Sequence, residues 1–180
     1  MKELFKLIGI LLFPLVIFSC EKDQDQVMDN EEELITDVVL TFTDDQGTNQ
    51  SFTFSDPDGP GGNAPSQDEI RLSAVYSYEM SVQFLDASDP MDVEDITEEV
   101  MEEAAEHLVC YNFTGNINSV IITDSDENSL PLGLEAVLIT EQPGNGTLTI
   151  SLKHLPDKTN AIPCNTGETD VEVTFQVVIE

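Results

Sequence analysis

The stretch VEVTFQVVI, residues 171–179, decides the fold class, because apolar side chains occupy every second position along it. Val171, Val173, Phe175, Val177 and Ile179 alternate with three polar residues and one valine. Successive side chains of an extended chain point to opposite faces, so a period of two makes one face apolar. The stretch therefore predicts a strand with one face in a hydrophobic core.

The same alternation recurs along most of the chain, with turn-forming residues between the segments. We predict further strands over residues 34–43, 50–55, 70–87, 109–114, 119–123, 134–140 and 147–154. The turn from Asp44 to Gly47 predicts a hairpin between the first two, and Pro143-Gly144-Asn145-Gly146 predicts another between the last two. Many short strands with turns between them indicate an antiparallel, immunoglobulin-like β-sandwich.

One segment has a helical period instead. Ile96, Val100, Ala104 and Leu108 recur at intervals of four, and glutamates occupy the opposite face. Asp95 stands where a helix N-cap is favoured. We predict one short amphipathic helix, from Ile96 to about Leu108, lying against the β core.

The first residues have the pattern of an export signal. Lys2 and Lys6 precede an apolar run from Leu7 to Phe18, which is too short to span a bilayer. The run ends in Ser19-Cys20, which resembles the cleavage and lipidation site of a bacterial lipoprotein. We predict a signal peptide over residues 1–19 and a diacylglycerol on Cys20. The alternative is an ordinary signal peptide with an incidental cysteine.

After Cys20, residues 21–33 are charged and polar except for Val27 and Met28, so they cannot bury enough apolar surface to fold alone. We interpret residues 20–33 as a flexible lipidated tether, followed by a β-sandwich domain over residues 34–180. The segment EKDQD, residues 21–25, resembles the signal that sends Bacteroidetes lipoproteins to the outer face of the outer membrane. The prediction is an outer-membrane lipoprotein, on the cell surface or on the periplasmic face.

Acidic residues outnumber basic ones by 36 to 6, for a formal net charge of −30. A surface of this sign repels nucleic acid, so we predict no nucleic-acid partner. Cations, basic protein surfaces and neutral solutes are the partners that it favours. A simpler explanation is that the acidity keeps a tethered exported protein soluble.

Three cysteines are present, and assigning Cys20 to lipid leaves Cys110 and Cys164. An even remainder in an oxidising compartment predicts a disulfide between them. The alternative is a pair of buried thiols.

The two histidines suggest a metal site. Glu103 and His107 would share a face of the predicted helix, and His154 would end a strand. If the two ends meet, His107 and His154, with Glu103 or Glu106, could hold Zn²⁺ or another transition metal. The alternatives are a favourable charge near a helix C-terminus for His107 and a surface strand position for His154.

A second candidate is a calcium loop. Asp124, Asp126, Asn128 and Glu135 have the spacing of oxygen ligands in an EF-hand, but Ser129 replaces the usual glycine and strands flank the segment. Ca²⁺ held by Asp124, Asp126 and Asn128 in a turn is the hypothesis, and a hairpin turn rich in Asp and Asn is the alternative.

The sequence carries no GxSxG, no HExxH and no glycine loop of the phosphate-binding kind. We therefore predict a binding or accessory protein rather than an enzyme.

Several segments together resemble a group of small flavobacterial lipoproteins. They are EEELIT (31–36), DITEEVMEEAAEH (95–107), residues 124–133, LKHLPDK (152–158) and GETDVEVTFQVVI (167–179). The resemblance implies an outer-membrane lipoprotein that accompanies a TonB-dependent transporter, and it implies no catalytic residue. Members often carry the label of a type 1 periplasmic-binding fold, whose many helices do not match the strand pattern found here.

Overall fold

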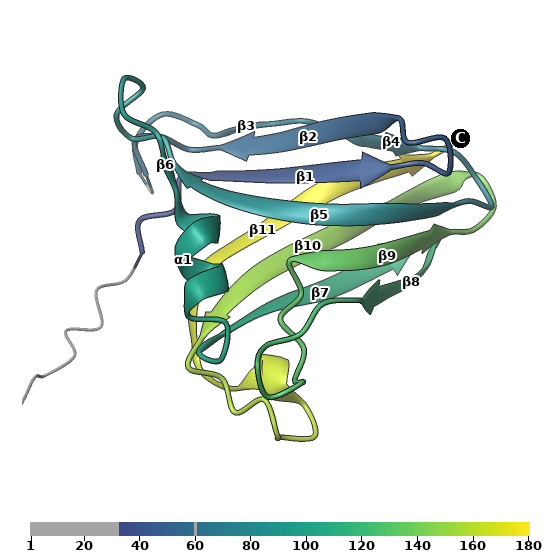
Figure 1. Cartoon of the computed structure of the whole chain (residues 1–180). Helices are drawn as coiled ribbons and strands as arrows, with labels where there is room; N and C mark the ends of the chain where they lie inside the picture. The colour runs from purple at the N-terminus through teal and green to yellow at the C-terminus, as the bar shows by residue number, and fades with distance from the viewer. Residues whose placement is uncertain (1–32, 60) are drawn as a thin grey trace, which may run out of the picture. The chain divides into compact units, whose positions relative to one another are not determined.

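In the computed structural model, which describes residues 33–59 and 61–180, two β-sheets lie face to face (Figure 1). The larger sheet contains β1 (Asp37–Thr43), β2 (Asn49–Ser55), β3 (Ser66–Gln67), β5 (Ser77–Asp86), β6 (Glu94–Asp95), β8 (Ile117–Ile122) and β9 (Glu135–Thr140). The smaller sheet contains β4 (Ile70–Leu72), β7 (His107–Gly115), β10 (Gly144–His154) and β11 (Glu168–Ile179). The predicted mainly β, antiparallel sandwich with one short helix is confirmed, although β4 joins β11 in parallel.

The core lies between the sheets and is built from the alternating positions. Leu148, Ile150 and Leu152 of β10 are buried together with Val173 and Phe175 of β11. The large sheet contributes residues such as Leu40, Phe42, Met80, Phe84 and Leu138, none of which is exposed. Burial of these side chains supplies the main driving force for folding.

The predicted long strand over residues 70–87 is wrong in one respect, because it is two strands in different sheets. β4 pairs with β11 of the small sheet, whereas β5 pairs with β1 and β9 of the large one. The chain crosses between the sheets at residues 73–76, where Val75 has a positive φ of 55°. Alternation continues nearly unbroken through this crossing, so periodicity alone does not reveal it.

The predicted hairpin at Pro143–Gly146 is also wrong, since β9 belongs to the large sheet and β10 to the small one. Gly144 and Gly146 instead allow neighbouring segments of the chain to approach them closely. A Cβ on Gly144 would lie 2.3 Å from Oδ1 of Asn116, and one on Gly146 would lie 2.2 Å from the carbonyl oxygen of Thr114. The two neighbouring crossovers between sheets, 115–117 and 141–144, can lie side by side only because these side chains are absent.

The helix is shorter than predicted. α1 (Ile96–Glu102) is preceded by Asp95, whose side chain accepts a hydrogen bond from the Thr97 amide, as expected of an N-cap. It ends before Glu103, and His107 already pairs with His154 as the first residue of β7. Strand pairing with β10 therefore overrides the helical pattern over the last predicted turn.

Cys110 of β7 and Cys164 of the 3-10 turn η1 (Pro163–Asn165) form the predicted disulfide, with 5.9 Å between their Cα atoms. It connects the small sheet to the loop that follows β10. In antibody domains the corresponding bond joins the two sheets, so this bond has a different role.

The signal peptide, Cys20 and the tether up to residue 32 lie outside the described residues. Within residues 33–59 and 61–180, no helix has the length and apolar character needed to cross a bilayer.

Candidate metal centre

Two histidines meet where the inner row of the small sheet ends. His154 continues the row of buried residues on β10 that includes Ile150 and Leu152, and His107 lies directly opposite it on β7. Their rings stack, with centroids 4.8 Å apart and an angle of 16° between the planes. The side chains are nearly inaccessible to solvent, at 0% exposed for His107 and 10% for His154. The prediction left open whether the two histidines meet, and the structure brings them together as a cross-strand pair.

A β-bulge adds a carboxylate to the pair. In the pairing of β10 with β11, Leu152 lies opposite Val171 and Lys153 lies opposite Thr169, so Asp170 is an extra residue. Such a bulge changes the direction in which a side chain points. Asp170 thereby joins the histidines, and ligand atoms of the three residues lie within 4.8 Å of one another.

His107 is held by hydrogen bonds at both ring nitrogens. Nδ1 lies 3.2 Å from the backbone oxygen of Glu103, and because a carbonyl only accepts, Nδ1 carries a proton and donates it. Nε2 lies 3.0 Å from Oε1 of Glu33. In a neutral ring with this tautomer, Nε2 presents a lone pair, and the carboxylate oxygen presents one as well. The contact between these two atoms therefore needs a proton or a metal ion between them.

The charges around the site favour a cation. Burial by itself would lower the pKa of His107, but the hydrogen bond and charge of Glu33, the Glu103 carbonyl and the charge of Asp170 outweigh it and raise the pKa. Burial and the neighbouring Glu33 carboxylate raise the pKa of Asp170 more than the two histidines lower it. One oxygen of each carboxylate, Oε2 of Glu33 and Oδ2 of Asp170, is buried without a hydrogen-bond partner among the described residues.

These groups form a donor set for a transition metal. Imidazole nitrogen and carboxylate oxygen both bind Zn²⁺ at about 2.0–2.2 Å, which places tetrahedral ligands about 3.3 Å apart. The present separations, up to 4.8 Å, require a modest rotation of the side chains toward one another. A carbonyl that accepts from the far nitrogen of a ligand histidine is the usual outer partner of such sites, and Glu103 supplies it.

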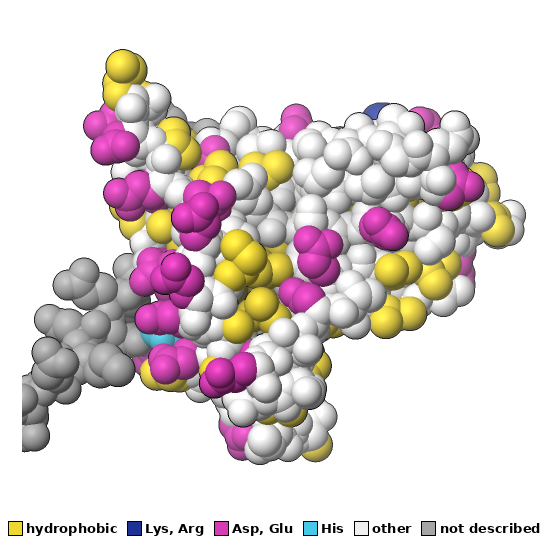
Figure 2. All heavy atoms as spheres, viewed as in Figure 1, with side chains coloured by type: hydrophobic (Ala, Val, Ile, Leu, Met, Phe, Trp, Pro, Cys, Tyr) yellow, Lys and Arg dark blue, Asp and Glu magenta, His cyan; other side chains and the backbone are white. Residues whose placement is uncertain are grey.

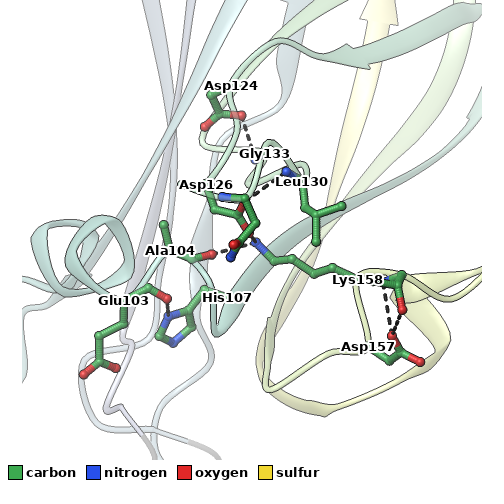
Figure 3. Close-up of polar contacts among 11 residues, drawn as sticks. Glu103, Ala104, His107, Asp124, Asp126, Leu130, Gly133, Asp157 and Lys158 are labelled. Carbon is green, nitrogen blue, oxygen red and sulfur yellow. Dashed lines mark hydrogen bonds and ion pairs between the residues drawn. The ribbon is translucent and has the colours of Figure 1, made fainter.

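Glu103 therefore does not take part as predicted. The reason given for it, a helix face shared with His107, fails because the helix ends at Glu102. Its carboxylate points away from the His107 ring, and only its backbone oxygen contacts it (Figure 3). Glu106 comes nearer to the site, with Oε2 4.0 Å from Nε2 of His154.

An acidic hollow adjoins the site. It has a volume of about 540 Å³ and is lined by Glu102, Glu103, Glu106, Asp126 and Glu127, among others. Figure 2 shows acidic side chains gathered at the end of the molecule that carries α1, with a small part of a histidine visible between them. Because Glu106 both lines the hollow and reaches His154, the hollow gives a cation an approach of favourable sign.

The predicted calcium residues are engaged elsewhere. Asp124 accepts hydrogen bonds from the amides of Gly133 and Glu135. Oδ1 of Asp126 accepts from the amides of Asn128 and Leu130, and its Oδ2 lies 3.0 Å from the Lys158 ammonium (Figure 3). A calcium ion at Asp126 would have to displace Lys158, so the geometry lends the calcium hypothesis no support and favours the turn rich in Asp and Asn.

Two members of the histidine cluster, Asp170 and Glu33, were not among the predicted ligands. Asp170 directly precedes the alternating stretch 171–179, and no feature of the sequence marks it as the extra residue of a bulge. The sequence places Glu33 in the predicted tether, because it ends an acidic run. Its position directly before Leu34 and Ile35, where the first predicted strand begins, is the one hint in the sequence that Glu33 lies near the sandwich.

Comparison of the chain with protein families, with curated proteins and with solved structures found no match.

Proposed function

We propose that this protein is a non-enzymatic, lipid-anchored protein of the cell envelope that binds a divalent transition-metal ion through His107, His154 and Asp170. The observation that supports it most directly is the meeting of two buried histidines with a carboxylate placed by a bulge. Imidazole ligands favour zinc, copper and nickel over calcium or magnesium, and Zn²⁺ is the practical probe.

The alternative, that the two histidines are only packed residues of the hydrophobic core, accounts for less of the geometry. Two stacked neutral rings could simply fill the end of the sandwich. They would not require a carboxylate with an unpaired buried oxygen beside them, since burying such a group costs free energy unless a partner compensates it. A bound cation would compensate it.

Zinc titration of the purified protein by calorimetry tests the metal site. We expect one ion per chain in the parent and a loss of at least about tenfold in affinity for Asp170→Asn and for the double variant His107→Ala/His154→Ala. Glu103→Gln is the matched control, because its carboxylate points away from the ring. Undiminished binding by the double variant, with the fold verified by circular dichroism, would refute the proposal.

The anchor is supported by the sequence around Cys20 and is tested separately. Replacing the sulfur in Cys20→Ser should release the protein from the membrane fraction, because a thioether-linked lipid requires that sulfur. Equal retention of parent and variant in the membrane would contradict the anchor. Recovery of a TonB-dependent transporter with the natively purified protein would support the partner that the resemblance implies, and its consistent absence would count against that partner.

A further inference from the structure

Glu33 approaches the three ligands from a different part of the fold. It precedes β1 of the large sheet, whereas His107, His154 and Asp170 belong to β7, β10 and β11 of the small sheet. Its side chain is only 7% exposed, and Oε1 lies 3.0 Å from Nε2 of His107. Its other oxygen is buried without a hydrogen-bond partner among the described residues.

We infer that Glu33 is the fourth ligand of the metal ion, so that the ion fastens the chain before β1 to the end of the small sheet. This inference rests on the proposed function and adds a ligand and a mechanical role to it. Nε2 and Oε1 are already separated by nearly the distance between two ligands of one tetrahedral ion, about 3.3 Å.

A fourth protein ligand changes what the site can do. Three protein ligands leave a position for water, which is the arrangement of catalytic zinc, whereas four close the site. Two carboxylates and two neutral imidazoles also balance the charge of a divalent ion, which lowers the cost of holding that ion in a largely buried place. A closed, neutral site fits storage, transfer or structural support rather than hydrolysis.

The mechanical consequence follows from where the four residues lie. Without the ion, Glu33 is held near the small sheet by its contact with His107. With it, the segment that leads into β1 of the large sheet and three strands of the small sheet share one coordination centre. Loading with metal should therefore slow local opening of the residues that enter β1, where the Thr36 amide donates to Leu85.

The test compares Glu33→Gln with Glu32→Gln in the full chain, because both changes remove one negative charge from the same acidic run. Zinc affinity is measured by calorimetry, and amide hydrogen exchange is followed in a peptide covering residues 33–42, with and without Zn²⁺. We expect Glu33→Gln to lose at least about tenfold in zinc affinity and Glu32→Gln to match the parent. Zinc should slow exchange in this peptide in the parent and in Glu32→Gln, but not in Glu33→Gln.

The outcomes separate the two proposals. If Glu33→Gln binds zinc as tightly as the parent, or if zinc leaves exchange unchanged in the parent, the role of Glu33 is overturned while the three-residue site stands. If the parent binds no zinc, both proposals fail.

Discussion

At the scale of single residues, Lys158 holds three segments together. Its ammonium donates to the backbone oxygen of Ala104, 2.6 Å away, and lies 3.0 Å from Oδ2 of Asp126. Both side chains of the pair are almost fully buried, at 3% and 1% exposed. The loop after β10 is thereby tied to the turn that follows α1 and to the loop after β8.

Removing one partner of this pair should be costly. We expect Lys158→Met to lower the free energy of unfolding by about 3–5 kcal/mol, because it leaves the Asp126 carboxylate buried without its countercharge. Urea unfolding measures the change. Lys153→Met, at a partly exposed lysine that contacts Thr169, is the control and should change stability by less than about 0.5 kcal/mol. Equal effects of the two substitutions on the free energy of unfolding would contradict a stabilising role for the buried Lys158–Asp126 pair.

The same pair predicts an acid dependence. Burial opposes ionisation of Asp126, but the amide of Leu130, the Lys158 ammonium and the amide of Asn128 outweigh it and hold its pKa below the usual 3.8. A lowered pKa in the folded state gives stability that is fully present above the usual value and is lost as the pH falls below it.

Comparison of the parent with Asp126→Asn over a range of pH tests whether this stability is lost as the pH falls. The parent should be the more stable of the two at pH 7, and the difference between them should shrink as the pH falls below about 4. Urea midpoints measured between neutral and strongly acidic pH decide it. A difference that stays constant over this range would mean that Asp126 does not titrate with folding.

At the scale of elements, the disulfide fixes the loop after β10 to β7. Cys110 and Cys164 are 54 residues apart, and a loop of that length corresponds to about 4 kcal/mol in the chain-entropy account. The double variant Cys110→Ser/Cys164→Ser should be less stable by roughly that amount in thermal or urea unfolding.

Reduction of the parent serves as the control for this prediction, because it should produce the same loss without altering the sequence. A reduced parent as stable as the oxidised protein would contradict the predicted contribution.

Periodicity predicted most strands and the N-cap of the helix, because both depend on local side-chain pattern. It could not assign strands to sheets. β9 and β10 look like a hairpin around Pro143–Gly146, but they belong to different sheets: β9 pairs with β5 and β8, and β10 pairs with β7 and β11. The same limit explains the candidate site, where His107 and His154 were predicted but Asp170 depends on a register shift that only the paired strands define.

At the scale of the whole molecule, the large negative charge opposes folding. With 36 acidic against 6 basic residues, the folded state brings like charges closer together than the unfolded chain does. We expect the melting temperature to rise when NaCl is increased from about 10 mM to about 150 mM, because screening shortens the reach of repulsion from about 30 Å to about 8 Å.

Calorimetric scans at the two salt concentrations measure this effect. A sulfate-free chloride series keeps the comparison to screening, since sulfate stabilises proteins by exclusion from the surface. A melting temperature that falls with added NaCl would show that attractive pairs outweigh the repulsion.

The bulge in β11 has an evolutionary consequence. Asp170 is the one extra residue that β11 has in its pairing with β10. A single in-frame codon therefore separates a sandwich that carries this carboxylate from one that lacks it. Deleting that codon would restore an ordinary ladder and leave the buried alternation from Val173 onward in place. Lineages could therefore gain or discard the ligand by one short indel, without redesigning the scaffold that holds the histidines.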